Sequence, residues 1–367
     1  MILDIILPYK EIFSEEKASA VSITIKNSAE YSVYKSNIRI IGQFVNNPFV
    51  GFNFHGIKIN KLLHLGNNRS ILINYLKLLN TEKETKRIIE IHNRPYLFNL
   101  AVRKEKKYPI SLHFHNDPRD MKGSKTINQR IFIAQNAAAV YFVSNYIKNC
   151  FLEGIINKYS NLHIIPNAIQ RTLIKQTFKK KEVLFVGRLV SEKGAHIYVE
   201  SIRKLVSKHP DWKFIIIGTS KAGNVKLSTS YEKKLIADFD SLGENTKYLG
   251  FLPNKKVKQI LEQVSILIVP SLWEEPFALT ALEGVCSGAA VIASRVGGMK
   301  EMLQDTGLLI PKIDSKKLEK SIENLIKDDM LLKQYQNKAW QNYQYNQSDI
   351  IKLQDQLREK IIINFFD

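Results

Sequence analysis

The chain has 367 residues, of which 44% are hydrophobic, and its 54 basic and 35 acidic residues give a formal net charge of +19. This length exceeds what one hydrophobic core usually serves, so we expect two folded domains. No apolar run approaches the roughly 18 residues that a membrane-spanning helix needs. Two cysteines, Cys150 and Cys286, are too few and too far apart for a disulfide framework or a zinc site.

The positive charge has three interpretations: attraction to an anionic membrane surface or lipid-linked acceptor, binding of nucleic acid, or a background composition rich in Lys, Ile and Asn. No zinc knuckle, RNA-recognition signature or long basic tail supports the second, so we expect no nucleic-acid partner. The other two interpretations stay open. Because so few cysteines suit a reducing compartment, we expect a cytoplasmic protein, with peripheral attachment to the inner face of the cell membrane as a further option.

Short apolar strands alternate with helices in the first half of the chain. Residues 1–8 have no basic segment and carry Asp4 within an apolar stretch, so we interpret them as a first buried strand and not as a secretory signal. Apolar runs predict further strands at residues 38–44, 88–92, 110–115, 139–143 and 164–165, and helices are predicted at 127–138 and 145–153. These elements predict an N-terminal domain over residues 1–172.

The second half alternates more regularly, after a linker that we place at residues 173–181. Strands are predicted at residues 183–186, 214–218, 266–269 and 290–293. Helices are predicted at residues 195–206, 231–237, 257–264 and 279–286, and residues 315–367 have a helical pattern. Such alternation predicts a parallel, doubly wound sheet. We therefore expect a second domain at residues 182–345 and a terminal helix at 346–367 that packs back toward the first domain.

The segment Gly187-Arg188-Leu189-Val190-Ser191-Glu192-Lys193-Gly194 joins a predicted strand to a predicted helix. Ligands of open parallel sheets bind beyond the carboxyl ends of the strands, and helix N-termini favour anions. Arg188 and Lys193 could therefore neutralise a diphosphate and the charge that develops as it leaves. Taken alone, the same segment is also compatible with a solvated basic loop.

A second segment carries Glu275 in a Pro-containing loop and Glu283 inside the following helix. Eight helical residues rise roughly 12 Å, which exceeds the roughly 5–9.5 Å between the two carboxylates of a glycosidase. We therefore expect the two acids to contact different parts of one extended ligand, because a carboxylate accepts hydrogen bonds from two sugar hydroxyls. We interpret Glu274 as an exposed acid at the start of the helix.

Together these segments resemble the retaining glycosyltransferases of family 4. The resemblance rests on Gly187-Arg188-Leu189 with Lys193-Gly194, and on Glu275-Pro276-Phe277 through Glu283, the Glu-x7-Glu element of that family. It extends, in family order over residues 110–312, to Pro166-Asn167, Tyr248-Leu249-Gly250-Phe251, Ser287-Gly288, Val296-Gly297-Gly298 and Thr306-Gly307-Leu308-Leu309. It implies the α/β GT-B fold, in which two Rossmann-like doubly wound domains face each other across a cleft, the first for the acceptor and the second for a nucleotide sugar.

The resemblance also implies roles for residues of the second domain. Lys193 and Arg188, which follows Gly187, would bind the donor diphosphate, and Glu283 would hold the ribose hydroxyls. The donor sugar would be held by Glu275 and the backbone N–H groups of Phe277, Ala278 and Leu279. Phe251 lies where the backbone of family members contacts the nucleobase.

In the first domain, the resemblance places His113 or His115 near the reacting sugar, and we favour His115. Two stretches depart from the family pattern. A Gly-Gly loop often follows the first strand in the family, but this chain has Glu15-Glu16-Lys17-Ala18-Ser19-Ala20, whose side chains would crowd a close backbone approach. After Asn167 the usual Gly and Asp are replaced by Ala168 and Gln170, which weakens any role for this turn beyond joining the domains.

The sequence predicts a metal-independent enzyme without a cofactor. Asp238-Phe239-Asp240 resembles the Asp-x-Asp metal site of another glycosyltransferase fold, but it follows a helical stretch and not a strand, so we interpret it as surface charge. The predicted reaction is transfer of a hexosyl-type group, with retention, from a nucleoside-diphosphate sugar to a glycan or glycolipid acceptor. The sequence His115-Asn116-Asp117-Pro118 resembles that of bacterial enzymes of surface polysaccharide synthesis. This resemblance favours a role in the synthesis of lipopolysaccharide or capsule.

Two alternatives remain from the sequence. One is a nucleotide-sugar epimerase or phosphorylase on the same fold, which would release only sugar products or use free phosphate. The other is a non-catalytic GT-B protein that binds a sugar nucleotide.

Overall fold

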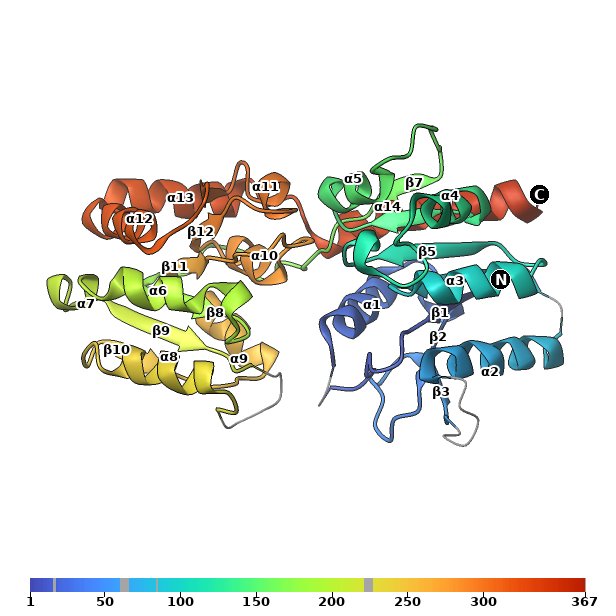
Figure 1. Cartoon of the computed structure of the whole chain (residues 1–367), viewed down its shortest axis with the longest axis horizontal. Helices are drawn as coiled ribbons and strands as arrows, with labels where there is room; N and C mark the ends of the chain where they lie inside the picture. Colours follow the sequence, from blue (N-terminus) through green and yellow to red (C-terminus); the bar gives the residue numbers. More distant parts are fainter. Residues whose placement is uncertain (16–17, 60–65, 84, 221–226, 367) are drawn as a thin grey trace. The chain divides into compact units, whose positions relative to one another are not determined.

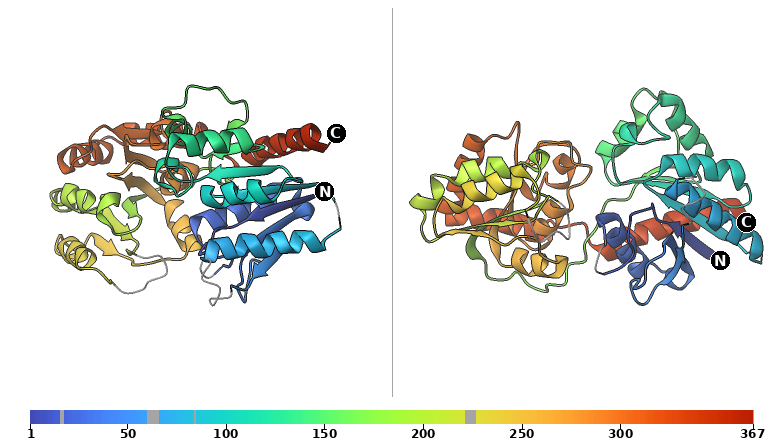
Figure 2. Two further views of the ribbon diagram at one scale, coloured as in Figure 1. Left: turned by 45° about the vertical axis from the view of Figure 1, so that its right-hand side comes forward. Right: turned by 60° about the horizontal axis from the view of Figure 1, so that its bottom comes forward.

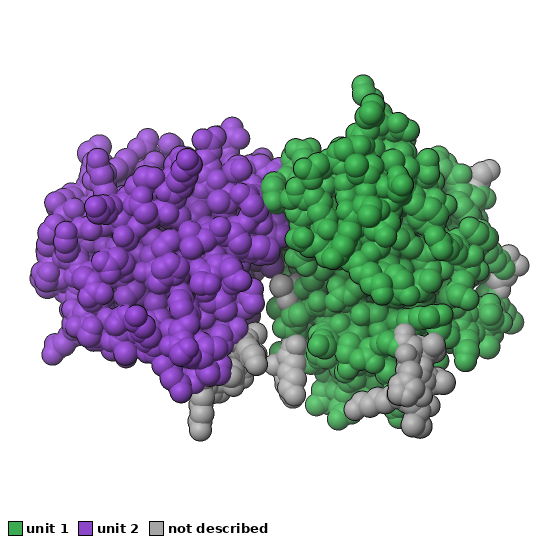
Figure 3. Space-filling model, viewed as in Figure 1, with its two compact units in different colours: residues 1–168, 347–367 green, residues 169–346 purple. Residues whose placement is uncertain are grey.

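The computed structural model describes residues 1–15, 18–59, 66–83, 85–220 and 227–366 (Figure 1). Each of its two sheets is covered on both faces by helices (Figures 1 and 2). Contacts divide the chain into two compact units, the first formed by Met1–Ala168 with Gln347–Asp367 and the second by Ile169–Asn346 (Figure 3). Among the described helices, none combines the length and the apolar character that spanning a bilayer requires.

The first unit contains a parallel sheet with the strand order β3-β2-β1-β4-β5-β6-β7 among the described residues. Its strands are β1 (Ile2–Ile6), β2 (Ile38–Gln43), β3 (Asn53–Ile57), β4 (Arg87–His92), β5 (Ile110–Phe114), β6 (Val140–Phe142) and β7 (Leu162–Ile164). The inner strands β4 and β5 are buried along their whole length because helices cover both faces of the sheet.

Some helices of the first unit begin at residues whose side chains accept a free backbone N–H group. They are α1 (Ala20–Tyr31), α2 (Asn67–Thr81), α3 (Pro95–Lys104), α4 (Ile127–Asn136), α5 (Asn145–Leu152) and α14 (Gln347–Phe366). Ser19 caps α1, Ser144 caps α5, and Thr126 forms a capping box with Gln129 at the start of α4. The 3₁₀ turns η1 (Lys35–Asn37) and η3 (Pro118–Asp120) complete the connections.

A buried ion pair attaches α14 to the first sheet. Arg358 donates from Nε and Nη2 to the two carboxylate oxygens of Glu90 on β4, at 2.9 and 2.8 Å. Asp355, also on α14, accepts hydrogen bonds from Ser32 Oγ (2.9 Å) and from the Val33 N–H (2.8 Å), just beyond α1. Removal of one partner would leave the other charge buried and unpaired, so these contacts hold the terminal helix in place.

The second unit repeats the architecture with the strand order β10-β9-β8-β11-β12-β13. Its strands are β8 (Lys180–Val186), β9 (Lys213–Ile217), β10 (Thr246–Tyr248), β11 (Val264–Val269), β12 (Ala290–Ser294) and β13 (Gly307–Ile310). Its helices are α6 (Ala195–Ile202), α7 (Leu205–Lys208), α8 (Ser230–Asp240), α9 (Asn254–Leu261), α10 (Leu279–Cys286), α11 (Met299–Met302), α12 (Ser315–Lys327) and α13 (Asp329–Gln341). The main core cluster lies between the sheet and α6, α8 and α12.

Both sheets reverse their strand order once, between β1 and β4 in the first unit and between β8 and β11 in the second. The connections leave such a reversal point in opposite directions, so a crevice opens there at the carboxyl ends of the strands. In the second unit the two strands that flank this point lead into the two segments that the sequence analysis selects, around Lys193 and Glu275.

The structure differs from the predicted elements in a few places. Residues 195–206 form two helices, α6 and α7, and not one. Val264 is the first residue of β11 and not the last of a helix, and β8 begins at Lys180, within the segment predicted as a linker. The structure also contains α1, α2, α3 and β3, which the sequence patterns did not predict.

Candidate functional site

An ion pair joins the loops that follow β8 and β11. Lys193, at the end of the 3₁₀ turn η4 (Ser191–Lys193), places Nζ 2.5 Å from Oε1 of Glu275. The same carboxylate oxygen accepts a hydrogen bond from Ser271 Oγ at 2.7 Å. The Glu275 side chain is 6% exposed and that of Lys193 is 23% exposed, so the ammonium borders solvent while the carboxylate is held beneath it.

Close backbone contacts fix this pair. Gly194 has φ +72°, and a Cβ atom on it would lie 1.9 Å from the Pro270 carbonyl oxygen. Gly297 has φ +49°, and a Cβ there would lie 2.1 Å from the Glu275 carbonyl oxygen. The Gly298 N–H also donates to that oxygen at 2.7 Å. The loops after β8, β11 and β12 therefore approach one another at positions that only glycine can occupy without displacement.

The exposed Arg188 side chain makes no hydrogen bond or ion pair with another described residue. It follows Gly187, whose N–H donates to the Ile217 carbonyl oxygen at 3.1 Å and whose own carbonyl would lie 1.9 Å from a Cβ on Gly218. The tight backbone fixes the direction of the loop, while the guanidinium stays available. Arg188 and Lys193 thus supply two cations at the carboxyl edge of one sheet.

Helix α10 begins beside the ion pair. Its N-cap, Ala278, has the left-handed values φ 63° and ψ 74°, and Phe277 is buried with its ring 5.5 Å from that of Tyr345. The Ala278 carbonyl accepts the first bonds of the helix, from Ala281 and Leu282. The first-turn N–H groups, starting at Leu279, have no acceptor within the helix and form a positive end.

Glu283 lies one turn further along α10, on the side that faces α9. Asn254 Nδ2 donates to Glu283 Oε1 at 3.4 Å. Burial raises the pKa of Glu283 to about 7, and the Asn254 hydrogen bond and the Lys258 charge oppose this rise without cancelling it. Phe251, 38% exposed, follows Gly250, whose carbonyl accepts the Gly218 N–H at 2.8 Å. Glu283 and Phe251 are therefore attached to the same edge of the second unit.

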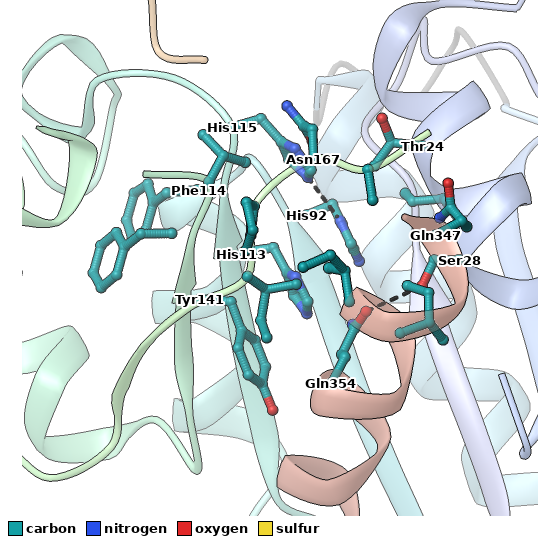
Figure 4. Close-up of a pocket in the computed structure, with 18 residues that line it drawn as sticks. Thr24, Ser28, His92, His113, Phe114, His115, Tyr141, Asn167, Gln347 and Gln354 are labelled. Carbon is teal, nitrogen blue, oxygen red and sulfur yellow. Dashed lines mark hydrogen bonds between the residues drawn. The ribbon is translucent and has the colours of Figure 1, made fainter. Parts of the chain in front are cut away.

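The first unit contains a cavity lined by three histidines (Figure 4). His113 and His115 lie at the end of β5, His92 ends β4, and Asn167 faces the cavity from the segment after β7. His92 Nδ1 lies 3.0 Å from His115 Nε2, and the rings of His92 and His113 are stacked with centroids 4.0 Å apart. The structure therefore brings together three predicted residues of this unit, His113, His115 and Asn167.

Two histidines of the cavity, His92 and His115, have lowered pKa values. Burial lowers the pKa of His115 to about 3 and holds that of His92 well below its ordinary value, with neighbouring imidazoles adding to the effect. Burial favours a raised pKa for Glu90, but the charge and hydrogen bonds of Arg358 outweigh it and keep this carboxyl ionised. His113 is buried beside Glu90, at 3.5 Å, whereas His115 is half-buried and more accessible from the cavity.

Among the described residues, Glu90, His92 and His113 form a group whose ligand atoms lie within 4.8 Å of one another. An imidazole binds a metal ion in the plane of its ring, but the rings of His92 and His113 are nearly parallel, at 13°. Their lone pairs cannot converge on one ion, and both oxygens of Glu90 are held by Arg358. The group fits a hydrogen-bonded stack better than a metal site.

The Asp238-Phe239-Asp240 segment lies within α8, where Phe239 is buried in the core. Residues two apart point in nearly opposite directions around a helix, so the two carboxylates do not share a face. The loop after β1 is described except for Glu16 and Lys17, which lie outside the described residues.

Sequence reasoning missed several members of these sites. The sequence patterns place His92 only as the last residue of a strand, although a polar residue at the carboxyl end of a buried strand is a signal for a site. Gly297 contacts Glu275 through tertiary approach, which no local pattern reveals, whereas Ser271 lies only four residues before Glu275 in the same loop. Glu274 is exposed as expected, but it lies in the loop before α10 and not at the start of the helix, and its carboxylate accepts the Gly297 N–H.

Residues 169–346, the whole second unit, match the model of the family described as glycosyl transferases group 1. YtcC of Bacillus subtilis (strain 168), named as a glycosyltransferase, is 24% identical over 270 residues, covering 67% of this chain and 65% of that protein. The uncharacterized glycosyltransferase MJ1178 of Methanocaldococcus jannaschii is 28% identical over 293 residues, covering 76% and 78%. The lipopolysaccharide 1,2-N-acetylglucosaminetransferase of Salmonella typhimurium is 21% identical over 252 residues, covering 64% and 61%. The matched segments thus span slightly less than two thirds of the first and third of these proteins.

Solved structures resemble the whole chain. HepE of Anabaena, crystallised in complex with UDP, has a TM-score of 0.78 at 16% identity, covering 98% of this chain and 100% of that one. Sucrose-phosphate synthase of Thermosynechococcus elongatus has a TM-score of 0.77 at 16% identity, covering 99% of each chain. The predicted fold is therefore confirmed: the chain has the GT-B fold, and its second unit carries the match to glycosyl transferases group 1.

Proposed function

We propose that this protein is a retaining glycosyltransferase that moves a sugar from a nucleoside-diphosphate sugar to a hydroxyl group of a glycan or glycolipid acceptor. The observation that carries the proposal is the Lys193–Glu275 pair, held by Ser271 at the reversal point of a sheet that matches glycosyl transferases group 1. A cation and an acid stand side by side there, which suits a ligand that carries a diphosphate next to a polyhydroxylated ring.

The cations would act on the donor diphosphate. Lys193 is fixed by Glu275 and borders solvent, while Arg188 is free to turn toward a ligand. The first turn of α10 adds backbone N–H groups and the positive end of a helix dipole. As the bond between sugar and diphosphate breaks, these groups offset the charge on the leaving oxygen, and that oxygen can take the proton of the acceptor hydroxyl. In this proposal the side chains do the electrostatic work, so no metal ion is required.

The acids would hold the two ends of the donor. Glu275 has one oxygen occupied by Lys193 and Ser271, which leaves its other oxygen to accept sugar hydroxyls. Glu283, eight residues further along, would accept the ribose hydroxyls once it is ionised. Retention is supported by the family resemblance of the Glu275–Glu283 element.

The comparisons favour a uridine nucleotide and a surface glycan. HepE was crystallised with UDP and with UDP-glucose, which supports a UDP-sugar as the first donor to test. The resemblance to a lipopolysaccharide glycosyltransferase supports a bacterial surface glycan as acceptor. Synthesis of such a glycan from nucleotide sugars would place the enzyme in the cytoplasm, and its net charge of +19 would favour contact with an anionic membrane surface.

A donor panel tests the proposal. UDP-, GDP-, ADP- and dTDP-sugars are titrated into the protein by calorimetry, and nucleotide release is then measured with and without a glycan extract as acceptor. The proposal expects one nucleotide series to bind, release of its diphosphate only with acceptor, and a product with the anomeric configuration of the donor by NMR. Binding with release of free sugar epimers instead would identify an epimerase, and no binding of any nucleotide sugar would refute the proposal.

A further inference from the structure

A groove runs along one face of helix α3 and shares no lining residue with the histidine cavity. From α3 it is lined by Tyr96, Asn99, Leu100 and Arg103, whose spacing of three, four and seven places them on one helix face. The other wall is formed by Lys122 and Gly123, in the segment between β5 and α4, and by Gln129 in the first turn of α4. The cavity measures about 250 Å³.

The two walls of the groove are locked together. The Tyr96 N–H donates to the Lys122 carbonyl oxygen at 3.1 Å, and Asn99 Nδ2 donates to the Gly123 carbonyl oxygen at 2.9 Å. Gly123 has φ +97°, and a Cβ on it would lie 2.5 Å from the Tyr96 nitrogen. The buried Arg130 donates to the carbonyl oxygens of Ser124, Lys125, Phe151 and Glu153. The groove is therefore a built surface with a fixed shape, and not a gap between two mobile loops.

Aromatic rings hold a cation at each end of the groove. Lys122 Nζ lies 4.4 Å from the centre of the Tyr96 ring, and the Arg103 guanidinium carbon lies 5.2 Å from the centre of the Phe132 ring. Tyr96 and Arg103 are two turns apart, which is roughly 10 Å along the helix. Among the described residues that line the groove, none is acidic. Two exposed cations that are already ordered favour an anionic ligand.

Groups that recognise hydroxyls lie between the cations. Asn99 lines the groove, and its Oδ1 is buried without a hydrogen-bond partner among the described residues. Gln129 adds a second amide, and Leu100 adds an apolar surface for the C–H face of a ring. Amides that face an apolar side chain, with a cation on either side, match a sugar that bears a phosphate or a carboxylate.

We propose that this groove is a subsite for an anionic sugar residue of the acceptor, such as a sugar phosphate or a uronate. The groove starts at the sheet edge that carries the histidine cavity, because α3 begins at Pro95, three residues after His92. An acceptor chain that presents a hydroxyl at that edge can extend outward along α3. The link to the acceptor rests on the proposed function, whereas binding of an anionic sugar does not.

Binding is tested on the full-length protein without donor. Glucose 1-phosphate, glucuronate, methyl glucoside and inorganic phosphate are titrated while backbone amide signals are followed by NMR. We expect glucose 1-phosphate and glucuronate to shift signals of residues 96–103 and 121–129, and to bind about tenfold or more tightly than the other two probes. The double variant Arg103→Ala/Lys122→Ala should lose about tenfold or more in this affinity.

The matched control is Lys77→Ala/Lys104→Ala, which removes the same charge from exposed positions outside the groove and should bind as the wild type does. Equal affinities of the two double variants, or equal binding of methyl glucoside or inorganic phosphate, would overturn the proposal. So would loss of binding to phosphatidylglycerol vesicles in the groove variant with unchanged sugar-phosphate affinity, because the groove would then be a membrane contact.

The two proposals can fail separately. Binding of a UDP-sugar is measured on the same variants, and the groove variant should bind it normally because Arg188, Lys193 and Glu275 are intact. If no UDP-sugar binds, binding of anionic sugars in the groove is still tested by itself. If no anionic sugar binds in the groove, binding of the UDP-sugar is still expected. If both bind, the groove variant should raise the KM for an anionic acceptor about tenfold or more with little change in kcat.

Discussion

Binding of the donor should depend on pH through Glu283. Burial raises the pKa of this carboxyl to about 7 in the free protein. At about pH 6 roughly a tenth of the side chain is ionised and at about pH 8 roughly nine tenths, so a ligand that needs the carboxylate gains about tenfold in association constant between them. The sign follows from the chemistry, because ribose hydroxyls donate hydrogen bonds and only the ionised form accepts them at both oxygens.

Calorimetry with UDP-glucose between these two pH values measures the effect. Its diphosphate is esterified at both ends and does not titrate in this range, so the protein alone changes protonation. In Glu283→Gln the association constant for UDP-glucose should not change with pH over this range. Lys258→Met removes a charge that lowers the Glu283 pKa, so the midpoint should move to higher pH. The half-buried Lys179, with a pKa lowered by desolvation to about 8, loses charge as pH rises and would change the affinity for an anion in the opposite direction. A wild-type profile without slope, or the same slope in Glu283→Gln, refutes the reasoning.

Further predictions concern the cations, the metal, the glycine contact and the terminal helix. Lys193→Ala or Arg188→Ala should lower kcat by about 10²–10³ in a steady-state assay, as loss of one group that stabilises developing charge does; full activity of either variant would remove the proposed mechanism. EDTA should leave turnover unchanged, and complete inhibition that Mg²⁺ reverses would show a metal-dependent reaction. Gly297→Ala forces a Cβ against the Glu275 backbone at a positive φ, so it should cost about 1–3 kcal/mol in urea unfolding and weaken donor binding; unchanged values would mean that the loops are not locked. Arg358→Met leaves the buried Glu90 carboxylate on β4 without its partner and should lower the free energy of unfolding by about 3–5 kcal/mol, measured against an exposed control such as Lys352→Met. Equal stabilities of the two variants would contradict the buried ion pair.

The fold of the second unit could be predicted because its strands are continuous apolar runs. Helices there show apolar residues at spacings of three and four, and α10 is found at the predicted residues. The elements of the first unit were harder to predict from the sequence. Helix α1 contains Val21, Ile23 and Ile25 at alternate positions, which is the pattern of a strand, and its helical state is set by the Ser19 cap and by packing against α14. The edge strand β3 has a glycine and few buried residues, so it lacks an apolar signature.

The candidate site was predictable as a set of residues but not as a geometry. Lys193 and Glu275 are 82 positions apart, and only the reversal of strand order brings their loops together. The motif and the family resemblance indicated these two residues, whereas Gly297 and His92 are identified only by their tertiary contacts. Burial also created the raised pKa of Glu283, which composition and spacing do not contain.

The central claim is that a nucleotide sugar binds at the carboxyl ends of β8 and β11. Amide hydrogen exchange, followed with and without a saturating UDP-sugar, tests this claim most directly. We predict slower exchange at residues 187–194 and 274–283 in the wild type, and no such slowing in Lys193→Ala at the same ligand concentration. Slower exchange confined to other parts of the second unit, or equal protection in the variant, would contradict the proposed site.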